Sequence, residues 1–228
     1  MPRVDWITFD CYGTLIDWED GVAEALAPFL LPPVDRGVLA AQYIALEAET
    51  EGGAYRPYRD VLVETSRELM VRLGSPLPPG QEHVLPDSLP GWVAFPDVPD
   101  ALRALRRVGY RLAILSNVDR DLLATSVPRL GITPDLLVTA EDCRSYKPRP
   151  GHWTYFQTRS SASPARTVHV GASLYHDMAP AEALGYRTVF INRREQPVQG
   201  ARPTRVLPDL TGLPDAIAEL ARAPESAR

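Results

Sequence analysis

The 228-residue chain has little that would tie it to a membrane, a metal or an oxidising compartment. Its two cysteines, Cys11 and Cys143, are too few for a disulfide framework and form no C-x-x-C pair. No stretch reaches the roughly 18 consecutive apolar residues that a membrane helix requires. The first residues also lack the basic and apolar segments of a signal peptide. These absences predict a cytoplasmic protein kept under reducing conditions.

An excess of positive charge is missing as well. The 24 lysines and arginines are outnumbered by 29 acidic residues, which gives a net charge of −5. Without a basic stretch the chain cannot neutralise a row of phosphates, so nucleic acid is excluded as a main partner. Apolar residues at 45% and charged residues at 23% are typical of a globular protein that buries a core. We therefore expect a small-molecule partner, with no nucleic acid and no membrane.

Short apolar runs rich in β-branched residues predict the strands of a sheet. They span residues 6–9, 111–115, 167–170 and 188–191, with a weaker run at 136–138. Helical patterns lie between them; one covers residues 99–108 and ends at Gly109. Strands that alternate with helices predict an α/β fold with a parallel sheet covered on both faces.

The alternation is interrupted once, after the first strand. Residues 17–91 have helical periodicity instead, most clearly at 40–51 and 59–73. We predict that residues 17–91 form an inserted helical cap, and that residues 1–16 and 92–228 form the core. Ligands bind outside the carboxyl ends of parallel strands, so a cap inserted there would cover the binding crevice.

Polar residues follow four of the predicted strand ends. They are Asp10, Thr14, Ser116, Asn117, Lys147, Ser173 and Asp177. Taken singly, such residues are usually helix caps or solvated charges. Taken together they fall at one edge of one sheet, where an aspartate can attack an electrophilic carbon or phosphorus. Lys147 would keep that aspartate ionised, and the turn at Gly13 would bring N–H groups close to developing negative charge.

Four ordered motifs resemble the haloacid dehalogenase superfamily of hydrolases. They are FDCYGTLID at 9–17, LSN at 115–117, SYKP at 145–148 and VGASLYHD at 170–177. The resemblance implies a Rossmann-like core with a helical cap inserted after the first motif. It also implies that Asp10 forms an aspartyl ester that water hydrolyses, supported by Ser116 and Lys147.

Two positions favour one branch of this superfamily. Phosphatases carry a second aspartate two residues after the nucleophile, where this chain has Tyr12, and a phenol of pKa near 10 is a poor proton donor. Ala172 replaces an acidic magnesium ligand of the last motif. Both differences favour the metal-independent (S)-2-haloacid dehalogenases, in which halide leaves without a general acid. We therefore expect no cofactor and no metal site.

The resemblance also predicts the residues of the site. The predicted catalytic residues are Asp10, Thr14, Ser116, Lys147, Ser173 and Asp177. The predicted substrate-binding residues are Tyr12, Trp18, Arg56, Arg59, Asn117 and His176. Well-characterised dehalogenases have an arginine on a cap helix, but residues 39–46 contain none. Arg56 and Arg59 are therefore the candidate cations for a small carboxylate anion.

Two other functions stay open at this point. One is a magnesium-dependent phosphatase of a small phosphate monoester that tolerates Tyr12 and Ala172. The other is a binding protein on a decayed enzyme scaffold, because Ala172 and Leu174 replace a serine and an asparagine of the dehalogenase motif. Members of the superfamily are often dimers, which leaves a homodimer open.

Overall fold

A computed structural model describes residues 4–222 of the chain. Its six strands form one parallel sheet in the order β3-β2-β1-β4-β5-β6. The strands are β1 (Trp6–Phe9), β2 (Arg111–Ser116), β3 (Leu136–Thr139), β4 (Thr167–Gly171), β5 (Arg187–Ile191) and β6 (Arg205–Leu207). The five predicted strands are confirmed as β1 to β5. The edge strand β6 was not predicted, because it is short and its residues are largely exposed.

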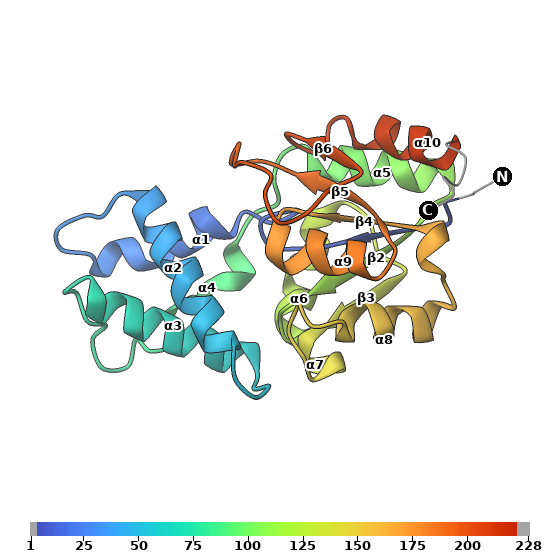
Figure 1. Cartoon of the computed structure of the whole chain (residues 1–228). Helices are drawn as coiled ribbons and strands as arrows, with labels where there is room; N and C mark the ends of the chain where they lie inside the picture. Colours follow the sequence, from blue (N-terminus) through green and yellow to red (C-terminus); the bar gives the residue numbers. More distant parts are fainter. Residues whose placement is uncertain (1–3, 223–228) are drawn as a thin grey trace.

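Alternate residues of the central strands build two separate packing layers, with α5 (Val98–Val108) and α10 (Leu213–Arg222) on one face and α8 (Gly151–Ser160) and α9 (Ala179–Ala183) on the other. Ile7 and Phe9 of β1 belong to a core that includes Leu102 of α5 and Ile217 of α10. Trp6 faces the other way, into a cluster with Trp153 of α8. Figure 1 shows α5 and α10 on one side of the sheet and α8 and α9 on the other. A strand buried on both faces carries few polar side chains, and Thr8, the one polar residue of the WITF run, is 2.9 Å from His169 Nδ1 of β4.

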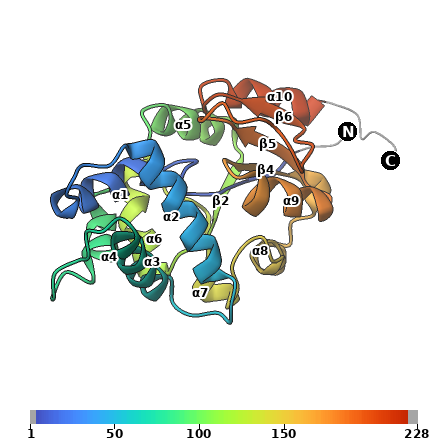
Figure 2. The ribbon, with the colours of Figure 1, turned by 60° about the vertical axis from the view of Figure 1, so that its left-hand side comes forward.

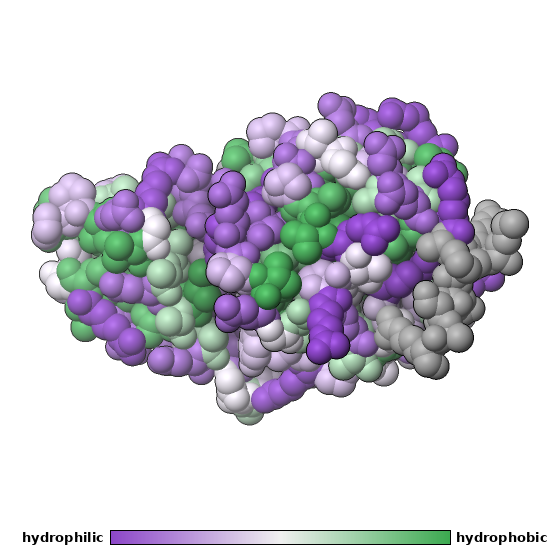
Figure 3. All heavy atoms as spheres, turned by 45° about the horizontal axis from the view of Figure 1, so that its top comes forward, coloured by the Kyte–Doolittle hydropathy of each residue, from purple (hydrophilic) through white to green (hydrophobic). Residues whose placement is uncertain are grey.

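Ten α-helices are present among residues 4–222. They are α1 (Trp18–Leu26), α2 (Arg36–Glu51), α3 (Tyr58–Arg72), α4 (Val84–Ser88), α5 (Val98–Val108), α6 (Arg120–Ser126), α7 (Ala140–Cys143), α8 (Gly151–Ser160), α9 (Ala179–Ala183) and α10 (Leu213–Arg222). No helix in this part of the chain combines the length and apolarity needed to cross a bilayer. The face shown in Figure 3 is mostly polar, with apolar residues in small patches.

Helices α1 to α4 lie together beyond one edge of the sheet (Figures 1 and 2). The chain enters and leaves this group along neighbouring paths. The N–H of Asp17 donates to the carbonyl of Val93 at 2.9 Å, and the N–H of Phe95 donates to the carbonyl of Leu15 at 3.0 Å. Adjacent entry and exit paths support an insertion after the first strand. The exact domain boundaries stay a prediction, with the cap at residues 17–91 and the core at residues 1–16 and 92–228.

One core carboxylate binds the beginning of a cap helix. Helix α3 starts after Pro57, which offers no side-chain cap. Asp119, which precedes α6, accepts hydrogen bonds from the N–H groups of Tyr58 at 2.9 Å and Arg59 at 2.8 Å. The free N–H groups of a helix start favour such a carboxylate. Asp119 therefore fixes the cap helix against the core.

We expect Asp119→Ala to lower the free energy of unfolding by about 1–2 kcal/mol, because α3 loses its only side-chain cap from the core. Urea unfolding followed by circular dichroism measures this change. Asp121→Ala is the matched control, since Asp121 forms an exposed ion pair with Arg59 that contributes little. Equal effects of the two substitutions would show that the cap contact is not specific.

Candidate active site

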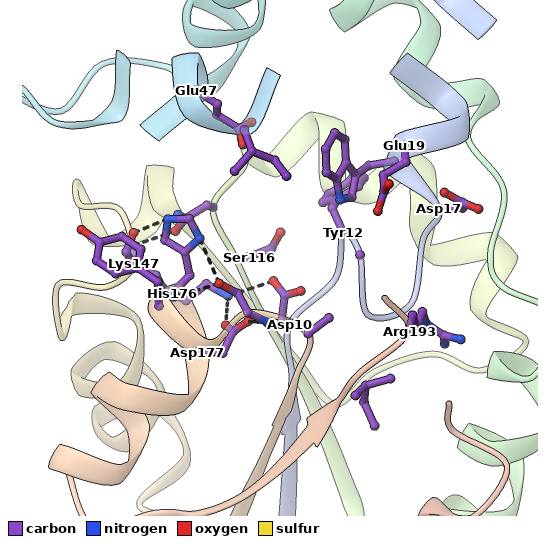
Figure 4. Close-up of a pocket in the computed structure, with 18 of the residues that line it drawn as sticks. Asp10, Tyr12, Asp17, Glu19, Glu47, Ser116, Lys147, His176, Asp177 and Arg193 are labelled. Carbon is purple, nitrogen blue, oxygen red and sulfur yellow. Dashed lines mark hydrogen bonds and ion pairs between the residues drawn. The ribbon is translucent and has the colours of Figure 1, made fainter. Parts of the chain in front are cut away.

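A single ammonium group lies between two carboxylates at the carboxyl end of the sheet. Lys147 Nζ is 2.9 Å from Asp10 Oδ1 and 2.7 Å from Asp177 Oδ1 (Figure 4). The side chains of Lys147 and Asp177 are each 1% exposed, and that of Asp10 is 13% exposed. Asp10 is thus the member of the trio that solvent or a ligand can reach.

Each member comes from a different strand end. Asp10 follows β1, and its N–H donates to the carbonyl of Val170 at 2.9 Å. Asp177 lies in the π-helical turn Leu174–Met178 after β4. That turn packs so closely on Gly171 that a Cβ there would lie 2.7 Å from the Asp177 side chain. A glycine at position 171 is therefore required for Asp177 to reach Lys147.

Further hydrogen bonds fix the trio. Thr14 Oγ1 donates to Asp10 Oδ2 at 2.7 Å, so both oxygens of Asp10 have a partner. The Asn117 side chain accepts from the Lys147 N–H at 2.7 Å and donates to the Lys147 carbonyl at 3.1 Å. The N–H of Ser173 donates to Asp177 Oδ2 at 3.2 Å. The orientation of the carboxylates is set before any ligand binds.

The charges of the trio support one another. Burial raises the pKa of Asp10, while the charge of Lys147 opposes that rise. Burial alone would lower the pKa of Lys147, but the two carboxylates raise it above its usual value. Burial would likewise raise the pKa of Asp177, but Lys147 lowers it. The ammonium and Asp177 thus stay ionised, and Asp10 is a carboxylate with increased proton affinity.

A pocket of about 540 Å³ lies between this trio and the cap. The predicted site residues that line it are Asp10, Tyr12, Trp18, Ser116, Asn117, Lys147, Ser173, His176 and Asp177. Thr14 is fully buried behind Asp10. The hydroxyl of Ser173 accepts from the His176 N–H at 3.0 Å and so caps the π-helical turn. The Tyr12 hydroxyl is 2.9 Å from Ser126 Oγ, and burial raises the pKa of this phenol well above its usual value.

The structure does not bring Arg56 and Arg59, the predicted substrate-binding cations, into this pocket. Arg56 Nη1 donates to Glu64 at 2.5 Å, and Arg59 Nη2 donates to Asp121 at 2.8 Å. Neither residue is among the described residues that line the pocket. Both arginines flank the start of α3, and these carboxylates hold their guanidinium groups outside the pocket.

The sequence analysis missed two acidic residues on the cap side of the pocket. Glu47 and Glu51 of α2 both line it. Glu47 Oε1 accepts from Tyr43 at 3.1 Å and from Tyr58 at 2.5 Å. Glu51 Oε2 lies 3.4 Å from Asn117 Nδ2. Their spacing offered a signal, because positions 43, 47 and 51 fall on one face of a helix in the predicted cap.

The donor set does not fit a magnesium ion. Magnesium prefers six oxygen ligands in octahedral geometry. Here a nitrogen, Lys147 Nζ, lies between the carboxylates of Asp10 and Asp177, and Ala172 supplies no side-chain oxygen. Within residues 4–222 no group of three or more His, Cys, Asp or Glu side chains is placed to hold a metal.

Comparisons with known proteins agree with this geometry. The chain is 28% identical over 199 residues to haloacetate dehalogenase H-2 of Moraxella sp. (strain B), covering 85% of this chain and 88% of that protein. It is 31% identical over 139 residues to ribulose-1,5-bisphosphate 5-phosphatase of Halopiger xanaduensis, covering 57% of each. A crystal structure of an L-2-haloacid dehalogenase superposes with a TM-score of 0.83 at 26% identity, covering 95% of this chain and 99% of that one.

The family of haloacid dehalogenase-like hydrolases matches residues 4–185, which is most of the chain. The match covers all four motifs and the trio of Asp10, Lys147 and Asp177. The α/β fold with its parallel sheet is the fold of the dehalogenase structure above. The chain therefore belongs to the haloacid dehalogenase-like hydrolases and is an enzyme of that family.

Proposed function

We propose that this enzyme is a metal-independent hydrolase of the (S)-2-haloacid dehalogenase type. Asp10 displaces halide from a saturated carbon of a small organic halide and forms an aspartyl ester. The observation that carries the proposal is the ammonium of Lys147, at 2.9 Å from Asp10 and 2.7 Å from Asp177. An ionised carboxylate in a pocket that shields it from most water is a competent nucleophile.

The reaction has two steps. In the first, an oxygen of Asp10 forms a bond to the carbon, and the carbon–halogen bond breaks as halide leaves with its electron pair. In the second, water attacks Cγ of Asp10 and the ester bond between Cγ and the product oxygen breaks. One proton of that water passes to the leaving alkoxide to give the alcohol, and the other is released to solvent as Asp10 becomes a carboxylate again. Thr14 and Lys147 hold the Asp10 oxygens by hydrogen bonds through both steps.

The state of Tyr12 favours halide over phosphate ester as the leaving group. An alkoxide that leaves a phosphate needs a proton, and Tyr12 occupies the position of the donor. Its hydroxyl contacts Ser126, and burial holds its pKa high, so it is a weak acid here. Halide is a stable anion and needs no such donor. The nitrogen of Lys147 between the two carboxylates likewise favours a reaction without magnesium.

We expect a single turnover in ¹⁸O-labelled water to place the label in Asp10, because water attacks Cγ and one oxygen of the carboxyl group is exchanged. Mass spectrometry of the peptide that contains Asp10 measures this. Chloride release from 2-chloropropionate, 2-chloropropionamide and 1-amino-2-chloropropane identifies a substrate for the experiment.

Asp10→Asn is the control, which has to lack the label and to release chloride no faster than the same compound does without enzyme, since 1-amino-2-chloropropane also loses chloride by forming an aziridine. Turnover by the wild-type enzyme with no label in Asp10 would disprove the covalent step. Activity no higher than that of Asp10→Asn with every compound would instead support a decayed binding protein.

Replacement of Lys147 by methionine removes the charge that opposes the rise in the pKa of Asp10. The acid limb of the pH profile of kcat/KM reports protonation of the nucleophile, so it moves to higher pH in Lys147→Met. We expect kcat to fall by about 10²-fold or more above that limb, because the hydrogen bond to Asp10 is also lost. An unchanged acid limb with only a reduced plateau would show that Lys147 does not control the ionisation of Asp10.

Gly171→Ala places a Cβ 2.7 Å from the Asp177 side chain and pushes Asp177 away from Lys147. We expect a loss of about 1–3 kcal/mol in the free energy of unfolding, with reduced kcat. Thermal unfolding and steady-state kinetics measure both. Gly91→Ala is the matched control, because no described atom lies within 4 Å of its added Cβ. Similar losses in the two variants would exclude a specific role of Gly171.

A further inference from the structure

The pocket wall opposite Asp10 is acidic, although the sequence analysis expects a carboxylate-binding cation there. Glu47 and Glu51 lie one turn apart on α2 and both line the pocket. Figure 4 shows Glu47 extending from the cap toward the space above Asp10. A carboxylate group of a substrate would meet two carboxyl groups on this wall and no cation from the described residues, and burial raises the pKa of both Glu47 and Glu51.

The orientation of Glu47 is fixed by two phenols. Tyr43 and Tyr58 both donate to Oε1 of Glu47, at 3.1 and 2.5 Å. No hydrogen bond from a described residue uses Oε2, although Glu47 lines the pocket. Two donors on one oxygen leave the other free to accept from a ligand. Glu47 is therefore an oriented acceptor with one oxygen available.

Glu51 is also largely buried, with a side chain that is 8% exposed. Its neighbours compensate its charge weakly: Asn117 Nδ2 is 3.4 Å from Oε2, and His176 Nε2 is 3.9 Å from it. Burial lowers the pKa of His176, so this imidazole is neutral near pH 7. Burial and the neighbouring Glu47 raise the pKa of Glu51 well above its usual value, and Lys147 only partly opposes this rise. A positively charged ligand beside Glu51 would favour its ionised form.

The cations that line the pocket are already engaged, as far as residues 4–222 show. Lys147 contacts Asp10 and Asp177. Arg193 pairs with Asp97 at 2.9 Å and also donates to the carbonyl of Thr14. Arg194 pairs with Glu19, and its guanidinium lies 5.4 Å from the centre of the Trp18 ring. A substrate carboxylate would have to break one of these pairs.

Aromatic rings accompany the acidic residues. Trp18 and Tyr43 line the pocket with ring centres 5.3 Å apart, and Tyr58 lies beside Glu47. Aromatic rings next to carboxylates are the surroundings that bind ammonium groups, through the negative face of each ring. The aromatic wall and the acidic pair thus favour the same kind of ligand independently.

We propose that the substrate carries an ammonium group, bound by Glu47 and Glu51 of the cap, while its reactive carbon lies against Asp10. This inference rests on the proposed function only in assuming that the halogen-bearing carbon of the substrate reacts with Asp10. The ammonium donates to the free oxygen of Glu47 and to Glu51 and leaves the three engaged cations undisturbed. The enzyme is then selective for amino-substituted halides over haloacids.

Binding of three unreactive compounds of similar shape tests this without turnover. Isobutylammonium, isobutyramide and isobutyrate are titrated into the wild-type chain by calorimetry at pH 8. We expect isobutylammonium to bind at least about tenfold more tightly than isobutyrate, because charge-assisted hydrogen bonds replace charge repulsion. Isobutyramide, which donates without a charge, has an intermediate affinity.

Glu47→Gln and Glu51→Gln are each expected to abolish most of this preference with little change in shape. Glu49→Gln is the matched control, because Glu49 lies on the same helix with a side chain that is 68% exposed. It should keep the wild-type preference. Thermal unfolding identifies a variant that is misfolded. If both Glu47→Gln and Glu51→Gln are misfolded, the preference of the wild-type chain for isobutylammonium over isobutyrate still tests the inference.

Isobutyrate that binds as tightly as isobutylammonium would overturn the inference, and so would wild-type enzyme that binds no isobutylammonium. Turnover of 2-chloropropionate that is unaffected by Glu47→Gln and Glu51→Gln would leave the reaction standing and refute the ammonium site. Selective ammonium binding without halide release from any compound would refute the reaction and leave the site standing.

Discussion

The architecture of the site depends on one buried ammonium group. Lys147 is almost completely removed from water and would be unstable there without compensation. Asp10 and Asp177 provide that compensation from two neighbouring strands, β1 and β4. Because the ammonium needs both carboxylates, the loops after these strands have to converge, and the glycine at 171 has to leave room for Asp177. The same contacts hold Asp10 ionised and oriented toward the pocket, so the requirements of stability and of chemistry coincide.

The core was predictable because its signals are local. A strand buried on both faces carries few polar side chains, and a parallel strand ends where polar residues begin, so the strand ends could be placed from the sequence. Asp10, Lys147 and Asp177 then fall at one edge by topology alone. Edge strand β6 escaped prediction because Arg205 and Val206 are exposed and carry no such pattern.

The cap was predictable as a helical segment but not in its orientation. Arg56 and Arg59 lie near the expected position in sequence, yet Glu64 and Asp121 draw their charges away from the pocket. Which face of α2 meets the pocket depends on how α2 packs against α3 and on the contact of Asp119 with the start of α3. Those are tertiary contacts between segments far apart in the sequence. The acidic spacing of Glu47 and Glu51 becomes informative only when that face is known.

Reaction and selectivity are thus divided between the two parts of the chain. The sheet edge supplies Asp10, the nucleophile of the proposed reaction, while Glu47 and Glu51 of α2 would determine which charge a ligand can bring next to it. A cation on the cap would favour an acidic substrate. It would offset the net negative charge of Asp10 and Asp177, which the single ammonium group of Lys147 does not balance. Glu47 and Glu51 on the cap supply no such cation. With the proposed ammonium site, the electrostatic field of the whole pocket favours a positively charged molecule beside Asp10, Lys147 and Asp177.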